Sequence, residues 1–578
     1  MYTQTMASFQ RFTVKGQAYW RIVESRRVNG KPRPVPVAYL GKADDLLARL
    51  RQLDSLRVRS LSHGAVAALV ALAQQLDLCG AIDRQLAAGG RRVRPCLAAA
   101  APSPPAPPLK ADGLSVGTSL TLASIGRACH PTSKRAFAAW AQTTTLGELL
   151  AVPVTPLTSQ HFWDQMDQVP LEAMPLIEKL VVTRAIALFQ LPLDTLLFDG
   201  TNFFTFIASS NRRADGLAAR GKNKQKRVDL RQVSLALLCS RATGVPLWHL
   251  TYAGNVADAK CFAEVLPLVK KRIEELGAPL QGLTLVYDKG NVSRVNQHLV
   301  DESQLHYVSA LTTASQKSLV SLANSQLEPV PVREEVVQAY RTTRQIWGAE
   351  RTVVVYVSER LRAGQLQGIR QHLRSARKWL DDLAATLARG TQRRDRARIE
   401  RDIETRLKGR QFLNQILRFE LLGTDPKLSL TYAVDEAALQ QLAAERLGRV
   451  VLMTNRHEWP TAEIIQAYHS QADVEAAFRD WKNVDHIAVR PQFHWTVQKL
   501  HVHNFICFLS YLLAKLLLLK AQRAGQAVAS IGSLLTRLAD VRRATVVRCT
   551  DGGKPRVSTM LEEMAPDLVS LCSALDIR

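Results

Sequence analysis

Short apolar segments of strand length in the middle of the chain limit the folds that it can adopt. They are LDTLLFD and NFFTF on the two sides of Gly200, LRQVSLALLC at 230–239, LTLVY at 283–287 and HYVSAL at 306–311. A helical pattern at 257–275 lies among them, and strands that alternate with a helix in this way predict an α/β layer. A further strand at 448–454 and a long helix at 461–482 continue the pattern later in the chain. We therefore expect one α/β core whose two parts are separated in the sequence.

The rest of the chain is divided by changes in this pattern. We expect a small β element at 1–45, a mainly helical region at 46–190, core parts at 191–315 and 446–525, an insertion at 316–445 and a basic tail at 526–578. Asn29-Gly30 is a strong two-residue hairpin signal, whereas the Pro/Ala-rich run at 94–109 excludes regular structure. The insertion begins with Val-rich strand-like pieces and continues over 359–422 as a hairpin of two charged helices.

The charge balance indicates what the chain binds. It has 76 Lys and Arg against 51 Asp and Glu, a formal net charge of +25, together with 47% hydrophobic residues that allow a packed core. A surplus of this size favours a polyanionic partner, foremost a nucleic acid. A membrane surface is the alternative, but no amphipathic basic helix or lipid-attachment motif is evident. The most apolar stretch, Asn504–Leu519, has 16 residues, so we expect a buried helix and no membrane span.

Cysteine usage bears on the compartment. The eight cysteines form no CxxC pair and no zinc-type cluster, which is typical of reduced thiols in a cytoplasmic protein. The amino terminus, MYTQTMASFQRF, lacks the charged start and apolar centre of a secretion signal. A cytoplasmic location is therefore expected.

Three acidic residues are candidates for catalysis. Asp199 follows the run LDTLLF, Asp288 follows LTLVY, and Glu475 lies within the helix predicted at 461–482. Taken alone, an aspartate after a strand is more often a turn or cap residue. Several carboxylates at one edge of a sheet can, however, share Mg²⁺, a hard cation that prefers oxygen ligands. Two such ions about 3.5–4 Å apart can stabilise both the attacking and the leaving oxygen at a phosphorus atom.

The predicted helix adds a second pattern to these acids. At about 100° per residue, four of its polar side chains lie on one face. These are Tyr468, Gln471, Glu475 and Lys482. A neighbouring apolar stripe would pack on the sheet and comprises Val474, Phe478 and Trp481. Trp481 could instead stack on an extruded base, but its place in the stripe favours core packing.

Together these segments resemble the transposases of bacterial insertion sequences, in the DDE group whose last acid lies in a Y-(2)-R-(3)-E-(6)-K signature. Here the signature reads Tyr468, Gln471, Glu475 and Lys482, with glutamine in the place of arginine. The segments FDGTNFF, GKNKQKRVDLRQV, VYDKGN and RPQFHW are also similar. The resemblance covers about 190–315 and 446–515 and is looser in the amino-terminal half.

The resemblance implies an RNase H-like core, a mixed sheet flanked by helices, with a large insertion between the second and third acids. It implies that Asp199, Asp288 and Glu475 are the catalytic residues and ligands of two Mg²⁺ (or Mn²⁺) ions. Water would cut the 3′ strand at the element's end, and the freed 3′-hydroxyl would then attack target DNA. Tyr468, Gln471 and Lys482 would contact phosphates, Gln471 more weakly because an amide lacks the charge and fork of a guanidinium.

The expected DNA contacts extend beyond this signature. The basic loop 212–227 includes Lys222, Lys224, Lys226 and Arg227, and it would either hold a phosphate backbone beside Asp199 or be a solvated loop. Residues 46–190 are expected to bind the element's ends, although no recognition-helix motif is evident there.

The expected partners are double-stranded DNA and further copies of the chain. The DNA comprises the element ends and the target, and the chain would act as a homodimer or larger assembly in the bacterial cytoplasm, at the nucleoid and without a membrane. Two alternatives remain: a stand-alone RNase H-fold nuclease that cuts without joining, and a catalytically inactive DNA-binding relative.

Overall fold

The computed structural model describes most of the 578-residue chain. The described residues are 7–28, 31–53, 56–88, 113–208, 210–221, 223, 227–256, 258–390, 395–410, 412–425, 427–548 and 555–578. The Asn29-Gly30 turn and the Pro/Ala-rich run lie outside them, and so do the three lysines of the basic loop, Lys222, Lys224 and Lys226.

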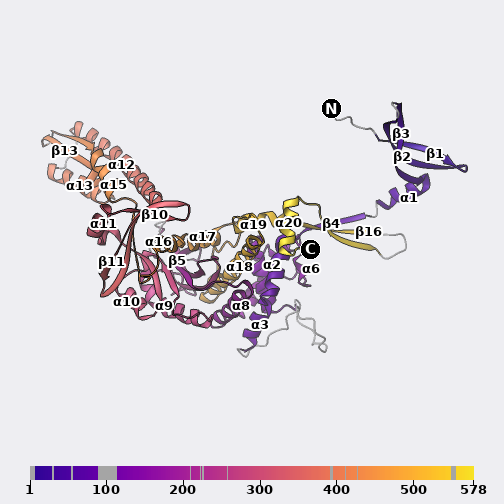
Figure 1. The fold of residues 1–578 in the computed structure, drawn as a ribbon, viewed down its shortest axis with the longest axis horizontal. Helices are drawn as coiled ribbons and strands as arrows, with labels where there is room; N and C mark the ends of the chain where they lie inside the picture. The colour runs from indigo at the N-terminus through magenta and orange to yellow at the C-terminus, as the bar shows by residue number, and fades with distance from the viewer. Residues whose placement is uncertain are drawn as a thin grey trace.

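A nine-stranded mixed sheet forms the centre of the molecule (Figure 1). Its strands are β5 (Thr195–Thr205), β6 (Arg231–Ser240), β7 (Pro246–Ala253), β8 (Thr284–Tyr287), β9 (His306–Leu311), β10 (Glu328–Val332), β11 (Glu335–Ile346), β12 (Ala349–Val357) and β15 (Arg449–Thr454). They are ordered β10-β11-β12-β15-β9-β8-β5-β6-β7. Strand β8 runs parallel to both β5 and β9, and the other pairs are antiparallel. The predicted α/β class is therefore confirmed as a mixed α/β fold.

Helices cover both faces of this sheet. Along β5, Phe198 and Asp199 point to opposite faces because side chains alternate on a strand. The Phe198 ring contacts Phe262 of α9 (Asp258–Glu275) at 5.7 Å, and the Phe203 ring contacts Trp481 of α17 (Gln471–Lys482) at 6.4 Å. Helix α9 therefore covers one face, and α17 covers the face that carries Asp199. The connection from β8 to β9 is α10 (Arg294–Glu302).

Two local expectations differ from the structure. The segments on the two sides of Gly200 form the single strand β5, because β6 pairs with it without interruption from Leu196 to Thr205. The helix predicted at 461–482 is two helices, α16 (Thr461–His469) and α17, separated at Ser470. The polar face proposed for one helix is therefore divided between two.

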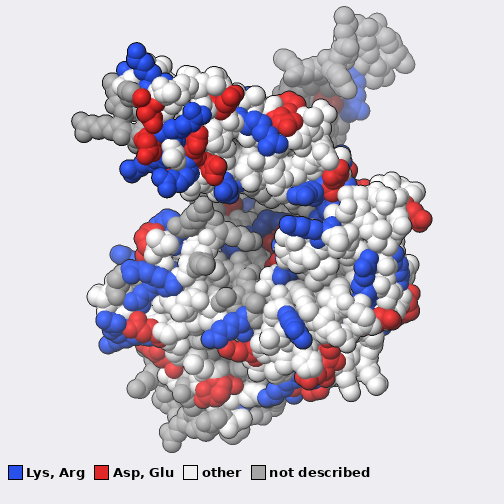
Figure 2. Space-filling model, turned by 90° about the vertical axis from the view of Figure 1, so that its left-hand side faces the viewer, with Lys and Arg blue, Asp and Glu red and all other residues white. Residues whose placement is uncertain are grey.

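The region expected to be an insertion has two structurally different parts. Strands β10, β11 and β12 extend the central sheet, next to β15. The remainder forms a lobe with its own apolar core and comprises α12 (Glu359–Ala388), α13 (Arg396–Lys408), α14 (Leu413–Ile416), β13 (Leu417–Thr424), β14 (Lys427–Val434) and α15 (Glu436–Glu445). The residues 417–422, predicted as helix, belong to strand β13. Figure 2 shows the lobe at the top of one face, above a hollow with Lys and Arg side chains on its rims.

The amino-terminal half combines a separate sheet with helices that join the core. Strands β1 (Ala7–Val14), β2 (Gln17–Val28) and β3 (Lys31–Lys42) form an antiparallel sheet, followed by α1 (Ala43–Leu53), at the end of the molecule opposite the lobe (Figure 1). The next helices are α2 (Gly64–Gln75), α3 (Leu78–Ala88), α4 (Val116–Cys129), α5 (Phe137–Ala141), α6 (Leu146–Leu149), α7 (Ser159–Asp167) and α8 (Ala173–Phe189). Side chains of α2, α3, α4, α7 and α8 belong to the central apolar core.

The basic tail is folded and returns to the amino-terminal half. It contains α19 (Ile531–Ala539), β16 (Arg542–Arg548), β17 (Arg556–Leu561) and α20 (Pro566–Leu575). Strand β16 pairs with β17 and with β4 (Leu56–Ser62), which was not predicted. This pairing joins segments that are almost the whole chain apart, so sequence proximity gave no indication of it.

The apolar stretch Asn504–Leu519 belongs to a longer helix, α18 (Val497–Arg523). Among the described helices, α18 alone is long and apolar enough by itself to cross a membrane, but 89% of its most apolar window is buried within the molecule. A bent pair, α2 with α3, passes the same test only if counted as one span. The prediction of a buried helix is confirmed.

Candidate active site

Asp199 of β5 and Asp288, the residue directly after β8, follow paired residues of two parallel strands. The register of β5 and β8 ends with Phe198 opposite Tyr287, and each aspartate is the next residue of its chain. Adjacent strands lie about 4.8 Å apart. Two segments separated by 88 residues of sequence therefore bring two carboxylates side by side at one position of the sheet.

The carboxylate of Asp288 bonds to a tyrosine, which excludes the cap role considered from sequence. Asp288 precedes the short 3₁₀ helix η1 (Lys289–Asn291), but its side chain makes no capping hydrogen bond there. Its Oδ1 instead accepts a hydrogen bond from the Tyr468 hydroxyl at 3.0 Å. Burial and the charge of Asp288 raise the pKa of Tyr468 above its usual value, so the hydroxyl stays protonated and donates.

Asp199 lies within a strand, where a turn or cap role does not apply. It is half-buried in β5, and its Oδ1 accepts a hydrogen bond from the backbone N–H of Gly200 at 2.8 Å. Gly200 allows a close approach of the Tyr252 side chain, which comes from β7 on the far side of β6, because a Cβ at this position would lie 3.0 Å from the Tyr252 hydroxyl. The glycine after the aspartate thus keeps this part of the sheet tightly packed.

Helix α17 is fixed along the same face as Asp199. Residues 199, 201 and 203 of β5 share one face by alternation. Lys482 donates from Nζ to Thr201 Oγ1 at 2.8 Å and lies 5.3 Å from the centroid of the Phe203 ring, and Trp481 stacks on that same ring. The predicted apolar stripe is buried, with exposed fractions of 0% for Val474, 5% for Phe478 and 0% for Trp481. This stripe holds the polar side of the helix over the sheet.

Glu475 lies between the two attachments of this helical segment. Tyr468, earlier in the chain, bonds to Asp288, and Lys482, later in the chain, bonds to Thr201. The side chain of Glu475 is exposed. The charges of both Glu475 and Asp288 raise the pKa of Tyr468, so both carboxylates lie within electrostatic range of this hydroxyl. No three His, Cys, Asp or Glu side chains of the described residues are close enough together to hold one metal ion.

Gln471, one turn before Glu475 at the start of α17, is buried. It is 9% exposed, and both amide atoms are buried without a hydrogen-bond partner among the described residues. The break at Ser470 changes the relation between Tyr468 and the residues of α17. In this structure the amide is therefore not accessible to a phosphate.

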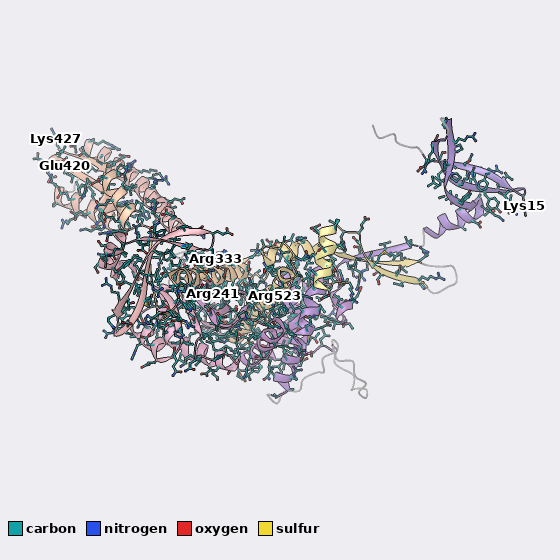
Figure 3. All side chains as sticks on the ribbon, viewed as in Figure 1. Lys15, Arg241, Arg333, Glu420, Lys427 and Arg523 are labelled. Atoms are coloured by element: carbon teal, nitrogen blue, oxygen red, sulfur yellow. The ribbon has the colours of Figure 1, made fainter. Side chains whose placement is uncertain are left out.

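Arg241 is a positioning residue that sequence analysis did not identify. It lies in the turn after β6, where its backbone N–H donates to Thr195 at the start of β5. Its side chain bonds to Glu463 of α16, and its Nε donates to Ser470 Oγ at 3.2 Å. Figure 3 labels it beside these helices, together with Arg333 of the β10–β11 turn. Arg241 thus joins both helices, at their break, to the strand of Asp199. A lone arginine in a turn carries no sequence signal for such a role.

The described part of the basic loop lies beyond the end of β5. Arg227 is exposed and pairs with Asp229 at 2.6 Å, which offsets part of its charge. Arg212 pairs more loosely with Asp215, at 3.5 Å, and its side chain is 87% exposed. These arginines are therefore accessible to a large anion.

Exposed aromatic side chains continue from this loop. Phe206, just after β5, is 53% exposed, and its ring lies 5.7 Å from that of Phe493, which is 64% exposed. The backbone of Phe206 donates to Gln492 at 3.0 Å, so the RPQFHW segment is attached to the end of the strand that carries Asp199. Trp495 of the same segment is 54% exposed. In the sequence, the resemblance of the RPQFHW segment to known transposases was the one indication that these aromatic residues matter.

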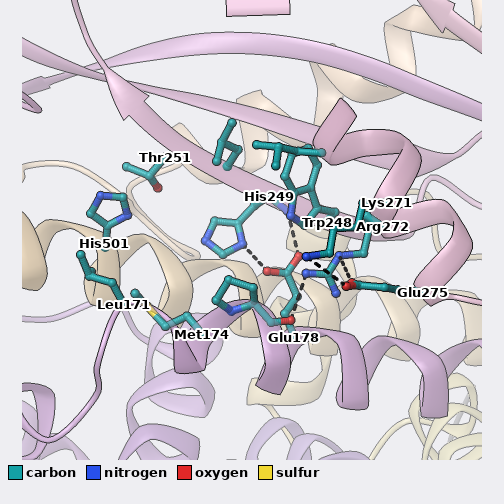
Figure 4. Close-up of a pocket in the computed structure, with 13 residues that line it drawn as sticks. Leu171, Met174, Glu178, Trp248, His249, Thr251, Lys271, Arg272, Glu275 and His501 are labelled. Atoms are coloured by element: carbon teal, nitrogen blue, oxygen red, sulfur yellow. Dashed lines mark hydrogen bonds and ion pairs between the residues drawn. The ribbon is translucent and has the colours of Figure 1, made fainter. Parts of the chain in front are cut away.

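A pocket between α8, α9 and β7 is separate from these acids. In it, Glu178 accepts hydrogen bonds from the backbone N–H and the ring nitrogen of His249, at 2.9 and 2.8 Å (Figure 4). Neither Asp199, Asp288 nor Glu475 lines it. We therefore assign the candidate site to the sheet and α17.

The fold and these side chains define a class of protein. Adjacent carboxylates on parallel strands, exposed arginines and a strong positive charge are the features of an enzyme that acts on nucleic acid phosphates. The family model described as the Transposase DDE domain matches residues 192–513, more than half of the chain, and the chain belongs to this family. It is a transposase, an enzyme of DNA cleavage and strand transfer. This confirms the predicted function.

The other comparisons add little. No curated protein sequence matches the chain. Among solved structures, it aligns with the cryo-EM structure of the piggyBac transposase synaptic complex with hairpin DNA, at 10% identity and a TM-score of 0.35, over 82% of this chain and 79% of that one. At this similarity the alignment carries no argument about fold or mechanism.

Proposed function

We propose that Asp199, Asp288 and Glu475 are the catalytic residues of this transposase and the ligands of two divalent cations, Mg²⁺ or Mn²⁺. The register of β5 and β8 supports the proposal, because each aspartate directly follows one of two paired residues, Phe198 and Tyr287, on a buried frame. The third carboxylate, on α17, lies between two attachments to this part of the sheet, from Tyr468 of α16 to Asp288 and from Lys482 of α17 to Thr201. Oxygen-only ligands suit these hard cations.

When bound, the ions would polarise the phosphate and activate the attacking oxygen. The side chains of the chain have separate tasks. The Tyr468 hydroxyl orients the Asp288 carboxylate and stays protonated. Lys482 supplies a positive charge beside Asp199, and we propose that its ammonium group and the Tyr468 hydroxyl contact phosphates next to the cleaved bond. Gln471 is not given this role because its amide is buried.

The wider proposal is that the chain mobilises a bacterial insertion sequence with an RNase H-like core. Its substrates would be the two ends of the element and the target DNA, bound by a homodimer or larger assembly at the nucleoid. The basic loop would hold the phosphate backbone, with Arg227 and the lysines at 222, 224 and 226. The exposed Phe206, Phe493 and Trp495 lie next to this loop and would contact the same DNA.

The test uses duplex DNA made from the sequences that flank the coding region. Asp199→Asn, Asp288→Asn and Glu475→Gln should each abolish strand cleavage in Mg²⁺ and leave DNA binding largely intact. Asp473→Asn is the matched control, because it removes a carboxylate from the same helix and should retain cleavage. Cleavage by all three variants would contradict the assignment.

Strand transfer is tested separately. A precut end with a free 3′-hydroxyl should be joined to a target plasmid by the unsubstituted chain and not by the three variants. A chain that cuts but never joins such ends would instead be a stand-alone nuclease.

A further inference from the structure

The amino-terminal sheet carries a strongly one-sided charge. Residues 1–42 contain eight Lys and Arg but only one acidic residue, Glu24. The sheet and α1 lie apart from the catalytic core in Figure 1, and Figure 3 labels Lys15 at the turn between β1 and β2. This concentration of positive charge suits a polyanion and opposes contact with a second copy of the same sheet.

The sheet also buries very little of itself. Val23, at 4% exposed, is the one buried side chain among those described in β1, β2 and β3. Tyr39 is 66% exposed on the face that carries Arg21 and Phe12, and Phe9 is 67% exposed on the opposite face. An exposed aromatic surface of this kind marks an interaction site, because a small sheet gains stability mainly from a covered apolar face.

One arginine on this sheet is held in a fixed orientation. Arg21 lies opposite Gln10 in the β1–β2 register, and its Nε donates to Gln10 Oε1 at 2.9 Å. Its guanidinium lies over the Phe12 ring, 4.9 Å from the centroid, and Phe12 contacts Tyr19 and Tyr39 at 5.8 and 5.9 Å. Among the described residues no acceptor is bound to its two terminal nitrogens. Arg21 therefore presents a pre-oriented pair of donors.

Two helices of the region expected to bind the element's ends, α2 and α4, are largely covered. Eight of the 12 residues of α2 and ten of the 14 residues of α4 are buried, and their apolar side chains belong to the core that also contains α18. A recognition helix must enter a groove with one face uncovered. The β1–β3 sheet is thus a better candidate for DNA recognition than these two helices.

We propose that the β1–β3 sheet enters the major groove of duplex DNA and that Arg21 reads a guanine there. A sheet can occupy the major groove, and the fork of an arginine matches the O6 and N7 acceptors of guanine. Lys15 and Arg33 flank the cluster and would contact phosphates. The inference rests on the transposase family of the chain and does not depend on which acids bind metal.

The experiment selects DNA with the full-length chain. Duplexes with a randomised centre are enriched by binding, and the variants Arg21→Ala and Arg21→Lys are compared on the selected duplex and on the starting pool. Arg26→Ala is the matched control, because it removes the same charge from the same strand at a residue already paired with Glu24 at 3.0 Å. Asp199→Asn should enrich the same motif as the unsubstituted chain, since it leaves this sheet intact.

The unsubstituted chain should enrich a motif that contains a guanine. Both Arg21 variants should bind the selected duplex roughly 10- to 100-fold more weakly and lose the preference for that guanine, while binding to the starting pool changes about threefold or less. Replacing the guanine with 7-deazaguanine, which lacks N7, should weaken DNA binding by the unsubstituted chain and by Arg26→Ala. It should not further weaken DNA binding by Arg21→Ala. This second measurement separates a direct contact from misfolding.

Three results would overturn the proposal. One is the absence of any enriched motif, another is an unchanged motif with Arg21→Ala, and the third is an Arg21→Lys variant that keeps full discrimination, which would indicate a phosphate contact. Binding of anionic lipid vesicles in preference to the duplex would assign the sheet to a membrane surface instead.

Discussion

The central sheet and the amino-terminal sheet differ in how much of their surface is buried. Strands β6 and β8 of the central sheet are almost entirely buried, so the positions of Asp199 and Asp288 are set by packing before DNA binds. In the amino-terminal sheet, Val23 is the one described side chain that is buried, and charged or aromatic groups occupy its surface. The comparison indicates that the chemistry is placed on a frame stable by itself, while recognition is placed on a surface that a partner completes.

The largest expected effect would break the frame of the central sheet. Trp481→Ala removes a fully buried indole that packs on Phe203 and Tyr511, and should lower the free energy of unfolding by about 3–5 kcal/mol. Urea denaturation followed by circular dichroism measures this loss. Val23→Ala is the counterpart in the other sheet and should leave the main transition within about 0.5 kcal/mol of its original value. An equal loss from both substitutions would contradict the comparison.

The next effect is the pH dependence of the free energy of unfolding, which depends on a histidine of α18. Burial lowers the pKa of His501, on α18, to about 4. Because this folded-state pKa is below the unfolded value near 6.5, the unfolded chain binds more protons between the two values, and stability falls as pH drops through that window. Between pH 6.5 and 4, the His501→Gln chain should lose roughly 3 kcal/mol less free energy of unfolding than the unsubstituted chain. Equal acid sensitivity in both chains, measured by urea titration at each pH, would show that His501 is not responsible.

A smaller change should affect the rate but not the stability of the frame. Tyr468→Phe removes the hydroxyl that bonds to Asp288, and cleavage should slow roughly tenfold, the effect of losing one hydrogen bond to a charged group. Single-turnover cleavage at saturating enzyme measures the rate. Because the pKa of Tyr468 is raised by burial and by Asp288, the rate should show no tyrosine ionisation up to pH 10. An unchanged rate would assign the tyrosine to packing alone.

The smallest effect concerns exposed charge near the site. Arg227→Ala removes a surface arginine that is already paired with Asp229, so binding to duplex DNA should weaken about threefold or less and its salt dependence should decrease by one phosphate contact at most. Fluorescence anisotropy at several salt concentrations measures both quantities. A hundredfold loss of affinity for duplex DNA would show that this loop, and not the amino-terminal sheet, is the principal DNA contact.

The sequence predicted those features that depend on local pattern. The apolar runs identified the core strands, and the stripe of Val474, Phe478 and Trp481 is buried as expected. The break at Ser470 was missed because helical periodicity continues through it, and the interruption is stabilised by Arg241 from a distant turn. The β4–β16 pair was missed for a similar reason, since strand partners far apart in sequence leave no mark on either segment.

The candidate site was predicted only as a set of residue types. Asp199, Asp288 and Glu475 were selected from their positions after apolar runs and within a helical signature, but their mutual placement depends on the order of the strands. The burial of Gln471 was also outside the reach of periodicity, because it depends on how α17 begins after the break.

The two-ended attachment of Glu475 has a consequence for control of the enzyme. The aspartates lie in or directly after strands of the sheet, and the buried stripe of α17 holds the helix of the glutamate. Two polar contacts, Tyr468 with Asp288 and Lys482 with Thr201, flank the glutamate on either side. Phosphates would compete for the same hydroxyl and ammonium groups, so arrival of DNA would free Asp288 and Thr201 from these two partners. We expect such an arrangement to complete the active site only when substrate DNA is bound, which would limit off-target cleavage of the host chromosome.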